Sequence, residues 1–151
     1  MTESRTTFTL TLFLLTSLLT GCALPSLKDR SQSEAFSQEQ TAGTRLGRAV
    51  GYEVENHPGL SGIATLQNPL DAFVARALLA EASDRSLDVQ YYIWQDDITG
   101  KLLLYSLYRA AERGVRVRLL LDDNGIAGMD EWLSALNHHG NVEVRLFNPF
   151  V

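Results

Sequence analysis

The sequence predicts an α/β fold, a parallel sheet built in the order β-α-β-α-β with flanking helices. Strand-like and helix-like periods of hydrophobicity alternate between residues 68 and 147. The chain has 151 residues, of which 45% are hydrophobic and 21% charged, the composition of a globular domain rather than of a disordered chain or a coiled coil. Three strands separated by two helices in so short a segment are typical of right-handed parallel crossovers.

The first helix is predicted from Pro69 to about Ser83. Asn68 is a favourable N-cap residue, Pro69 suits the first helical position, and Asp71 places a negative charge in the first turn. Apolar residues then recur at helical spacing, namely Leu70, Phe73, Val74, Ala77 and Leu78.

The first strand and the second helix follow directly. Between residues 87 and 94, apolar and aromatic side chains alternate with other side chains at a period of two, as in a strand. Thr99 is then predicted to cap the second helix, and Gly114 to end it. The apolar stripe of that helix is Leu103, Leu107, Ala110 and Ala111.

The second strand is predicted over residues 115–121. Its last three residues are all leucine, as expected of a central strand that is buried on both faces. A third helix is marked by Met129, Trp132, Leu133 and Leu136 and ends near Gly140. Residues 142–147 form the third strand and complete the predicted sheet.

The N-terminus is predicted to be a lipoprotein signal peptide over residues 1–21. Residues 8–19 form an apolar run that is too short to span a bilayer and suits a secretory signal. The segment Leu19-Thr20-Gly21-Cys22 resembles the bacterial lipobox, which makes Cys22 the lipid attachment site and the membrane a partner. An inert cysteine after an ordinary signal is the alternative. In bacterial lipoproteins, an aspartate directly after the lipidated cysteine is associated with retention in the inner membrane. This sequence has Ala23 at that position, so we expect the chain to be anchored at the periplasmic face of the outer membrane rather than in the inner membrane.

Residues 22–60 are predicted to be a tether and an irregular lead-in to the folded region. The segment from Pro25 to Thr44 is rich in Ser, Gln, Thr and charged residues, which bury too little apolar surface to compensate for the entropy of ordering. The net charge of −5 gives no electrostatic footprint for nucleic acid, so no nucleic-acid partner is expected. A single cysteine excludes an intrachain disulfide.

Two acidic pairs follow the first and second predicted strands. They are Asp96, Asp97, Asp122 and Asp123. Ligands of open parallel sheets gather at the carboxyl ends of the strands, so these residues are the candidate site. They could bind a divalent cation, position a basic group, or simply end strands and cap helices, and the last interpretation is favoured.

No other motif predicts a metal or a cofactor. The sequence has no dinucleotide fingerprint, P-loop, nucleophile elbow or zinc-protease motif. His57, His138 and His139 are expected on the surface. Arginines alternate along two predicted strands and are expected to line a sheet face or edge rather than bind phosphate; they are Arg116, Arg118 and Arg145.

Four ordered segments resemble the opening of the phospholipase D superfamily, close to its bacterial cardiolipin synthase-like members. They are residues 86–94, 97–100, 109–123 and 144–150. The resemblance implies that residues 61–151 are the first part of a phospholipase D-like lobe. It also implies a phospholipid substrate and metal-independent chemistry, in which the histidine of an H-x-K-x4-D motif attacks phosphorus and the lysine stabilises the charge.

The motif of that family is missing from this sequence. None of the three histidines is followed two residues later by lysine, and the only lysines are Lys28 and Lys101. No catalytic residue is therefore assigned, and we expect an incomplete domain, an N-terminal fragment that is inactive alone. A separately encoded C-terminal remainder could supply the motif. A lipid-anchored, non-catalytic binding module of the envelope is the alternative function, and a receiver-like phosphoacceptor is disfavoured.

Overall fold

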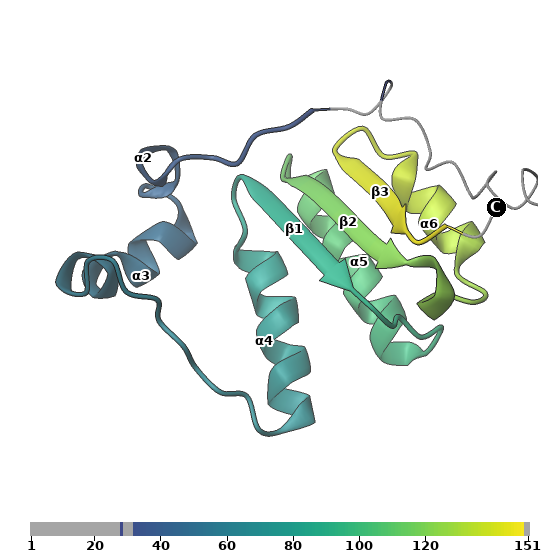
Figure 1. Ribbon diagram of the computed structural model, residues 1–151, viewed down its shortest axis with the longest axis horizontal. Helices are drawn as coiled ribbons and strands as arrows, with labels where there is room; N and C mark the ends of the chain where they lie inside the picture. Colours follow the sequence, from purple (N-terminus) through teal and green to yellow (C-terminus); the bar gives the residue numbers. More distant parts are fainter. Residues whose placement is uncertain (1–27, 29–31, 150–151) are drawn as a thin grey trace, which may run out of the picture. The chain divides into compact units, whose positions relative to one another are not determined.

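A parallel three-stranded sheet forms the centre of the computed structural model, which describes residue 28 and residues 32–149 (Figure 1). Strands β1 (Ser86–Tyr91), β2 (Arg116–Asp122) and β3 (Val142–Phe147) lie in the order β1-β2-β3. Helix α5 (Ile98–Glu112) connects β1 to β2, and helix α6 (Asp130–Asn137) connects β2 to β3. The predicted α/β class and β-α-β-α-β order are confirmed. The signal segment, Cys22, Phe150 and Val151 lie outside the described residues.

Helix α4 (Pro69–Ala82) begins as predicted, because the Asn68 side chain accepts a hydrogen bond from the Leu70 amide at 2.8 Å. Its apolar residues do not all face the core, however. Phe73 packs against the core cluster, whereas Leu70 and Leu78 are 68% and 61% exposed. The stripe predicted for this helix is therefore divided between a half-buried edge and an exposed one.

Helix α5 is capped by Asp97 and not by Thr99, which corrects the prediction. The Asp97 carboxylate accepts from the Gly100 amide at 2.8 Å and from the Thr99 hydroxyl at 2.7 Å. Thr99 already lies inside the helix, so its hydroxyl donates back to the capping residue. The helix ends as expected at Gly114, whose φ of 86° is a left-handed conformation that glycine adopts without strain.

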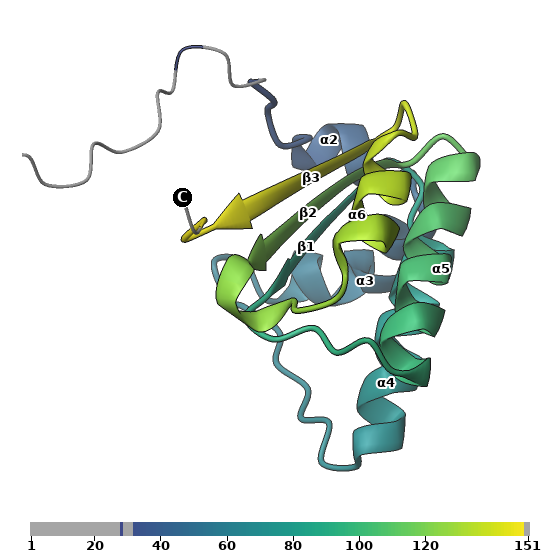
Figure 2. The same ribbon diagram turned by 90° about the vertical axis from the view of Figure 1, so that its right-hand side faces the viewer.

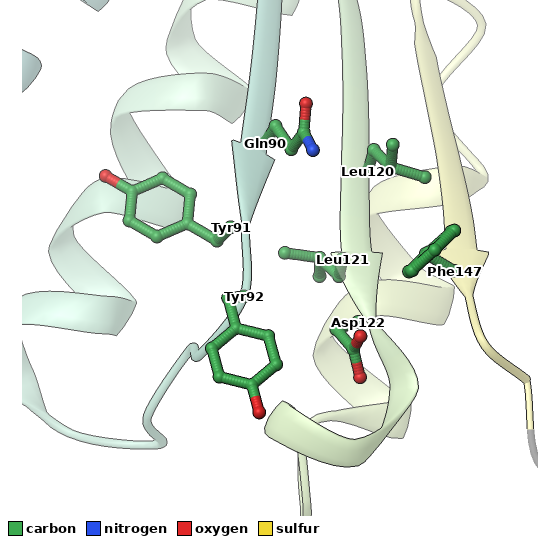
Figure 3. Close-up of a pocket in the computed structure, with 7 residues that line it drawn as sticks. All are labelled: Gln90, Tyr91, Tyr92, Leu120, Leu121, Asp122 and Phe147. Atoms are coloured by element: carbon green, nitrogen blue, oxygen red, sulfur yellow. The ribbon is translucent and has the colours of Figure 1, made fainter.

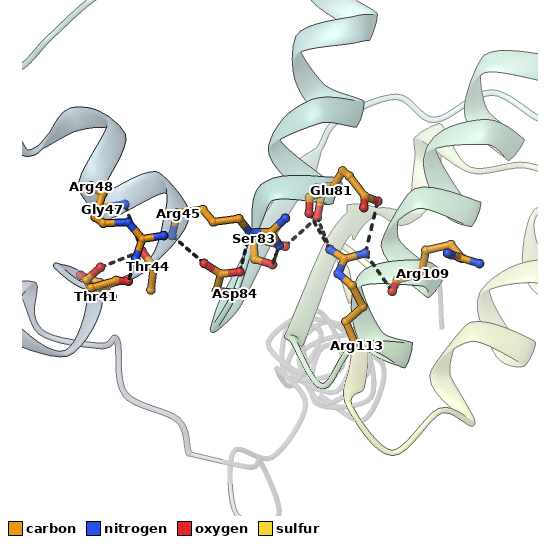
Figure 4. A network of polar contacts seen from close by, with 12 residues as sticks. Thr41, Thr44, Arg45, Gly47, Arg48, Glu81, Ser83, Asp84, Arg109 and Arg113 are labelled. Carbon is orange, nitrogen blue, oxygen red and sulfur yellow. Dashed lines mark hydrogen bonds and ion pairs between the residues drawn. The ribbon is translucent and has the colours of Figure 1, made fainter.

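Two helices occupy part of the segment that was predicted to be irregular, α2 (Gln38–Thr41) and α3 (Arg45–Asn56). Thr44 caps α3 by accepting from the Gly47 amide at 3.0 Å. The backbone amide and Nε of Arg45 both donate to Asp84, which ties the start of α3 to the residues after α4 (Figure 4). No residue of α3 is buried. The helix therefore rests on its cap and on surface contacts, although Leu46, Val50 and Val54 recur at helical spacing along it.

The sheet has an apolar face and a polar face. On β2, Val117, Leu119 and Leu121 are at most 1% exposed and belong to the core, and α5 and α6 lie on one side of the sheet (Figure 2). The alternating side chains form the polar face, defined here as Asp88, Arg116, Arg118, Glu143 and Arg145. The prediction that the strand arginines line a sheet face is thus confirmed. Within the described ranges, no helix is both long and apolar enough to cross a membrane.

Candidate functional site

The carboxyl ends of the three strands meet at one edge of the sheet, which holds the candidate site. Asp122 ends β2, and Asn148 follows β3. The Asn148 side-chain amide donates to Asp122 Oδ2 at 3.2 Å, so two strand ends are joined by side chains. Asn148 has a φ of 50°, in the left-handed region. Asparagine is one of the few non-glycine residue types that adopt this region readily. This backbone turn accompanies the contact of its amide with Asp122.

A shallow pocket of about 160 Å³ opens at this edge (Figure 3). Its lining residues are Gln90, Tyr91, Tyr92, Leu120, Leu121, Asp122 and Phe147. The Tyr91 side chain is directed away from Asp122 and Phe147 in Figure 3, whereas Tyr92 lies on the side of Asp122. The pocket therefore presents a carboxylate, a phenol and an amide between apolar side chains.

Asp122 is the most buried of the four predicted site residues, with 8% of its surface exposed. Its Oδ1 accepts from the Asn124 amide at 3.0 Å, which caps the short 3-10 helix η1 (Asp123–Gly125). Its two described partners, Asn124 and Asn148, are both neutral. Asp122 thus acts as a turn-capping residue. The carboxylate retains acceptor capacity for a basic group at the pocket.

The other three acids of the candidate site do not converge on it. Asp97 caps α5, and the hydrogen bonds from the Gly100 amide and the Thr99 hydroxyl lower its pKa. Asp96 forms an exposed ion pair with Lys101 at 3.0 Å. Asp123 begins η1. Within residues 32–149, no group of three or more His, Cys, Asp or Glu side chains is arranged to hold a metal ion.

Gly125 and Tyr92 contribute to this edge in a way that the sequence did not reveal. Trp94 donates its amide to the Gly125 carbonyl at 2.9 Å, which joins the loop after β1 to the loop after β2. A Cβ atom on Gly125 would lie only 2.0 Å from the Tyr92 carbonyl oxygen. The Asp-Asn-Gly turn was visible in the sequence, but the close approach of the second loop was not.

The three histidines lie away from the candidate site. His57 is at the end of α3, and His138 and His139 precede β3 and so lie at the opposite edge of the sheet. His57 and His138 are exposed, as predicted, whereas His139 is half-buried. His139 Nε2 lies 2.9 Å from a Glu112 carboxylate oxygen, and its ring packs edge-on against Tyr108. None of them supplies a nucleophile to the pocket.

Sequence comparison finds relatives that are much longer than this chain. Cardiolipin synthase C of Escherichia coli is 57% identical over 106 residues, which cover 70% of this chain and 22% of that protein. Uncharacterized proteins from two strains of Helicobacter pylori are 36% identical over 107 residues, 71% of this chain and 21% of theirs. The chain thus spans about a fifth of the length of these relatives.

No protein-family model matches the sequence. Among solved structures, the archaeal chromatin protein TrmBL2 aligns over 70% of this chain and 42% of that chain, with a TM-score of 0.47 and 15% identity. Similarity at that level supports no conclusion. The relationship to cardiolipin synthase C agrees with the segments that resembled the phospholipase D superfamily. The 57% identity to cardiolipin synthase C over 70% of this chain supports a cardiolipin synthase-like, phospholipase D superfamily relationship.

Proposed function

We propose that this chain is the N-terminal portion of a cardiolipin synthase-like enzyme of phospholipid metabolism, a phosphatidyltransferase or phosphodiesterase. The 57% identity to cardiolipin synthase C over 70% of the chain is the observation that carries the proposal. The parallel sheet supports it, because ligands of such sheets bind at the carboxyl ends of the strands, where Asp122 and its pocket lie.

These residues alone are proposed to be catalytically inactive. Nucleophilic attack on phosphorus needs an activated nucleophile and a positive charge for the developing phosphoryl anion. The described part of the carboxyl edge offers a carboxylate, a phenol and an amide, and no histidine in the sequence is followed by x-Lys. The nucleophile is therefore proposed to come from a segment outside these 151 residues, encoded with them or separately.

A lipid-transfer assay tests this function. The purified chain is incubated with phosphatidylglycerol vesicles, and cardiolipin is measured by thin-layer chromatography. We expect no product from the chain alone. We expect product when it is coexpressed with a cardiolipin synthase C that lacks the matching 106 residues. Cardiolipin formed by the chain alone would contradict the proposal that the chain lacks the nucleophile. Failure to form cardiolipin on coexpression would contradict the proposal that the chain is the N-terminal portion of such an enzyme.

Cys22 is proposed to anchor the chain to the periplasmic face of the outer membrane. The lipobox-like Leu19-Thr20-Gly21-Cys22 and the absence of aspartate after Cys22 support this location. Incorporation of labelled palmitate by the chain, and its loss in Cys22→Ala, are the expected results. Unchanged processing and fractionation of Cys22→Ala would exclude the anchor.

A further inference from the structure

Helices α3 and α4 each carry an apolar stripe that lies outside the core. On α3, Val50 and Val54 are 52% and 44% exposed, and on α4, Leu78 and Val74 are 61% and 43% exposed. The full stripes are Leu46, Val50 and Val54 on α3, and Leu70, Val74 and Leu78 on α4, and none of these side chains belongs to the core cluster. Residues spaced by four lie on one face of a helix, so each helix presents a continuous apolar face to solvent.

Helix α3 is poorly suited to exist without a packing partner. It has 12 residues, none of them buried, and its interior includes Gly51, a residue type that weakens a helix. Isolated helices shorter than roughly 12–15 residues are marginal in water, and most helical stability in proteins comes from packing of an apolar face. A Cβ atom on Gly51 would meet no atom within 4 Å, so there is room for another helix beside Val50. The stripe of α3 is therefore expected to need a cover.

The contact of Arg45 with Asp84 determines which surface α3 can reach. The Arg45 backbone amide and Nε donate to the Asp84 carboxylate at 2.6 and 2.8 Å (Figure 4). Arg45 is the first residue of α3, and Asp84 lies two residues beyond Ala82, the last residue of α4. The start of one helix is thus held beside the end of the other, the arrangement from which two helices can run antiparallel.

An antiparallel arrangement from this contact brings the two stripes into register. Both helices rise about 1.5 Å per residue, so a step along α3 matches an equal step backwards along α4. Counting from Arg45 beside the end of α4, Val50 then faces Leu78, and Val54 faces Val74. The register places apolar side chains opposite apolar side chains, which is the condition for helix packing.

The connection between the two helices is long enough to allow this arrangement. Residues 57–68 join α3 to α4, and every one of them is exposed. Antiparallel helices in contact are commonly joined by about 2–8 residues, and this connection has 12. Leu60 and Ile63 within it are 74% and 89% exposed, so the connection itself is not held by burial. It can therefore follow α3 without resistance from packed side chains.

We propose that α3 is a strap that closes onto α4 as an antiparallel helix pair, with Val50 on Leu78 and Val54 on Val74. The contact of Arg45 with Asp84 is the hinge of this strap. Closure covers both apolar stripes, and opening exposes the stripe of α4. The strap lies outside the Asp122 pocket, and it does not depend on the proposed function.

Disulfide cross-linking in the full chain tests the closure. Cys22 is the only cysteine of the sequence, so Cys22→Ser provides a background without thiols. One variant then combines Val50→Cys with Leu78→Cys. The matched control combines Val50→Cys with Leu79→Cys, because Leu79 is 51% exposed but points about 100° away around α4. Circular dichroism and the urea midpoint check that both variants fold.

We expect the first variant to form an intramolecular disulfide about tenfold faster than the control, because only its thiols are brought together by closure. Non-reducing electrophoresis distinguishes a disulfide within one chain from a disulfide between two chains. Mass spectrometry of the digested protein identifies the linked peptides.

The hinge is tested in the same cross-linking variant. Arg45→Gln removes the guanidinium contact with Asp84 and should slow the disulfide about threefold, a modest effect because the contact is exposed. Arg48→Gln is the matched control, since Arg48 lies on the same helix and donates to the Gly43 carbonyl. Equal rates in these two variants would contradict the hinge.

Two further results would overturn the strap. Equal rates for the Leu78→Cys and Leu79→Cys variants would mean random encounters of a segment that does not dock. Disulfides formed only between chains would mean that a second copy covers the stripe of α4. Neither result bears on cardiolipin formation, so the strap and the proposed function can fail separately.

Discussion

The two faces of the sheet differ in how their side chains are stabilised. On the apolar face, Leu119 and Leu121 of β2 are at most 1% exposed and are packed in the core. On the polar face, the neighbouring positions hold charged side chains that pair across strands, as Arg118 does with Asp88. The sequence predicted that the all-leucine end of β2 is buried on both faces. The structure shows that it is buried on the apolar face only. Leu120 between them is only half-buried.

Truncation of Leu119 is expected to give the largest effect. Leu119→Ala should lower the free energy of unfolding by about 2–5 kcal/mol, because it removes buried methyl groups and leaves a cavity. Leu120→Ala is the matched control on the same strand, and its cost should be clearly smaller because Leu120 is half-buried. Urea unfolding followed by circular dichroism measures both. Equal losses of unfolding free energy would mean that the two faces of the sheet are equally packed and would contradict the difference described here.

Substitution of Asp122 tests how much the hydrogen bonds at the carboxyl ends of the strands contribute to stability. Asp122→Ala removes the acceptor for the Asn124 amide and the Asn148 side chain. We expect a loss of about 1–3 kcal/mol, the usual cost of leaving partly buried hydrogen-bonding groups unpaired. Asp96→Ala is the control, since its ion pair with Lys101 is exposed. A loss for Asp96→Ala as large as that for Asp122→Ala would contradict the structural role given to Asp122.

The cap of α5 gives a smaller effect and decides between two residues. Asp97→Ala should lower the urea midpoint, because the Gly100 amide loses its partner at the helix start. Thr99→Ala should lower it less, because the Thr99 hydroxyl donates to Asp97 and caps no backbone amide itself. The reverse order would restore the sequence-based assignment of Thr99 as the cap.

The fold was predictable from the sequence where local signals and burial agree. Asn68, Pro69 and Gly114 marked helix ends, and strand β3 has the predicted bounds of residues 142–147. Helix α3 was missed because its contacts to Asp84 are distant in sequence and none of its residues is buried. For the candidate site, the acids were found but not their grouping. The hydrogen bond of Asn148 to Asp122 depends on how β2 and β3 pair, which no local pattern encodes.

The ion pair of Asp88 with Arg118 on the polar face is expected to give the smallest effect on stability. The pH dependence of stability shows whether this pair stabilises the fold. The hydrogen bond from Arg118 lowers the pKa of Asp88 below its usual value of 3.8. A carboxylate with a lowered folded-state pKa stabilises the fold above its unfolded pKa, and this contribution disappears as the pH falls through the lowered value. Because Asp88 is largely exposed and screened by solvent, we expect only about 0.2–1 kcal/mol near neutral pH.

A double-mutant cycle of Asp88→Asn and Arg118→Gln isolates this coupling from the other contacts of Arg118. The coupling energy should be present at pH 7 and should fall toward zero as the pH drops through the lowered pKa of Asp88, where the folded carboxylate becomes protonated. High salt should weaken it in the same direction, because the pair is exposed. Coupling that stays constant through this pH range would mean that the pair is not ionic. Coupling as large as the loss in Leu119→Ala would mean that the polar face stabilises the sheet as strongly as the core does.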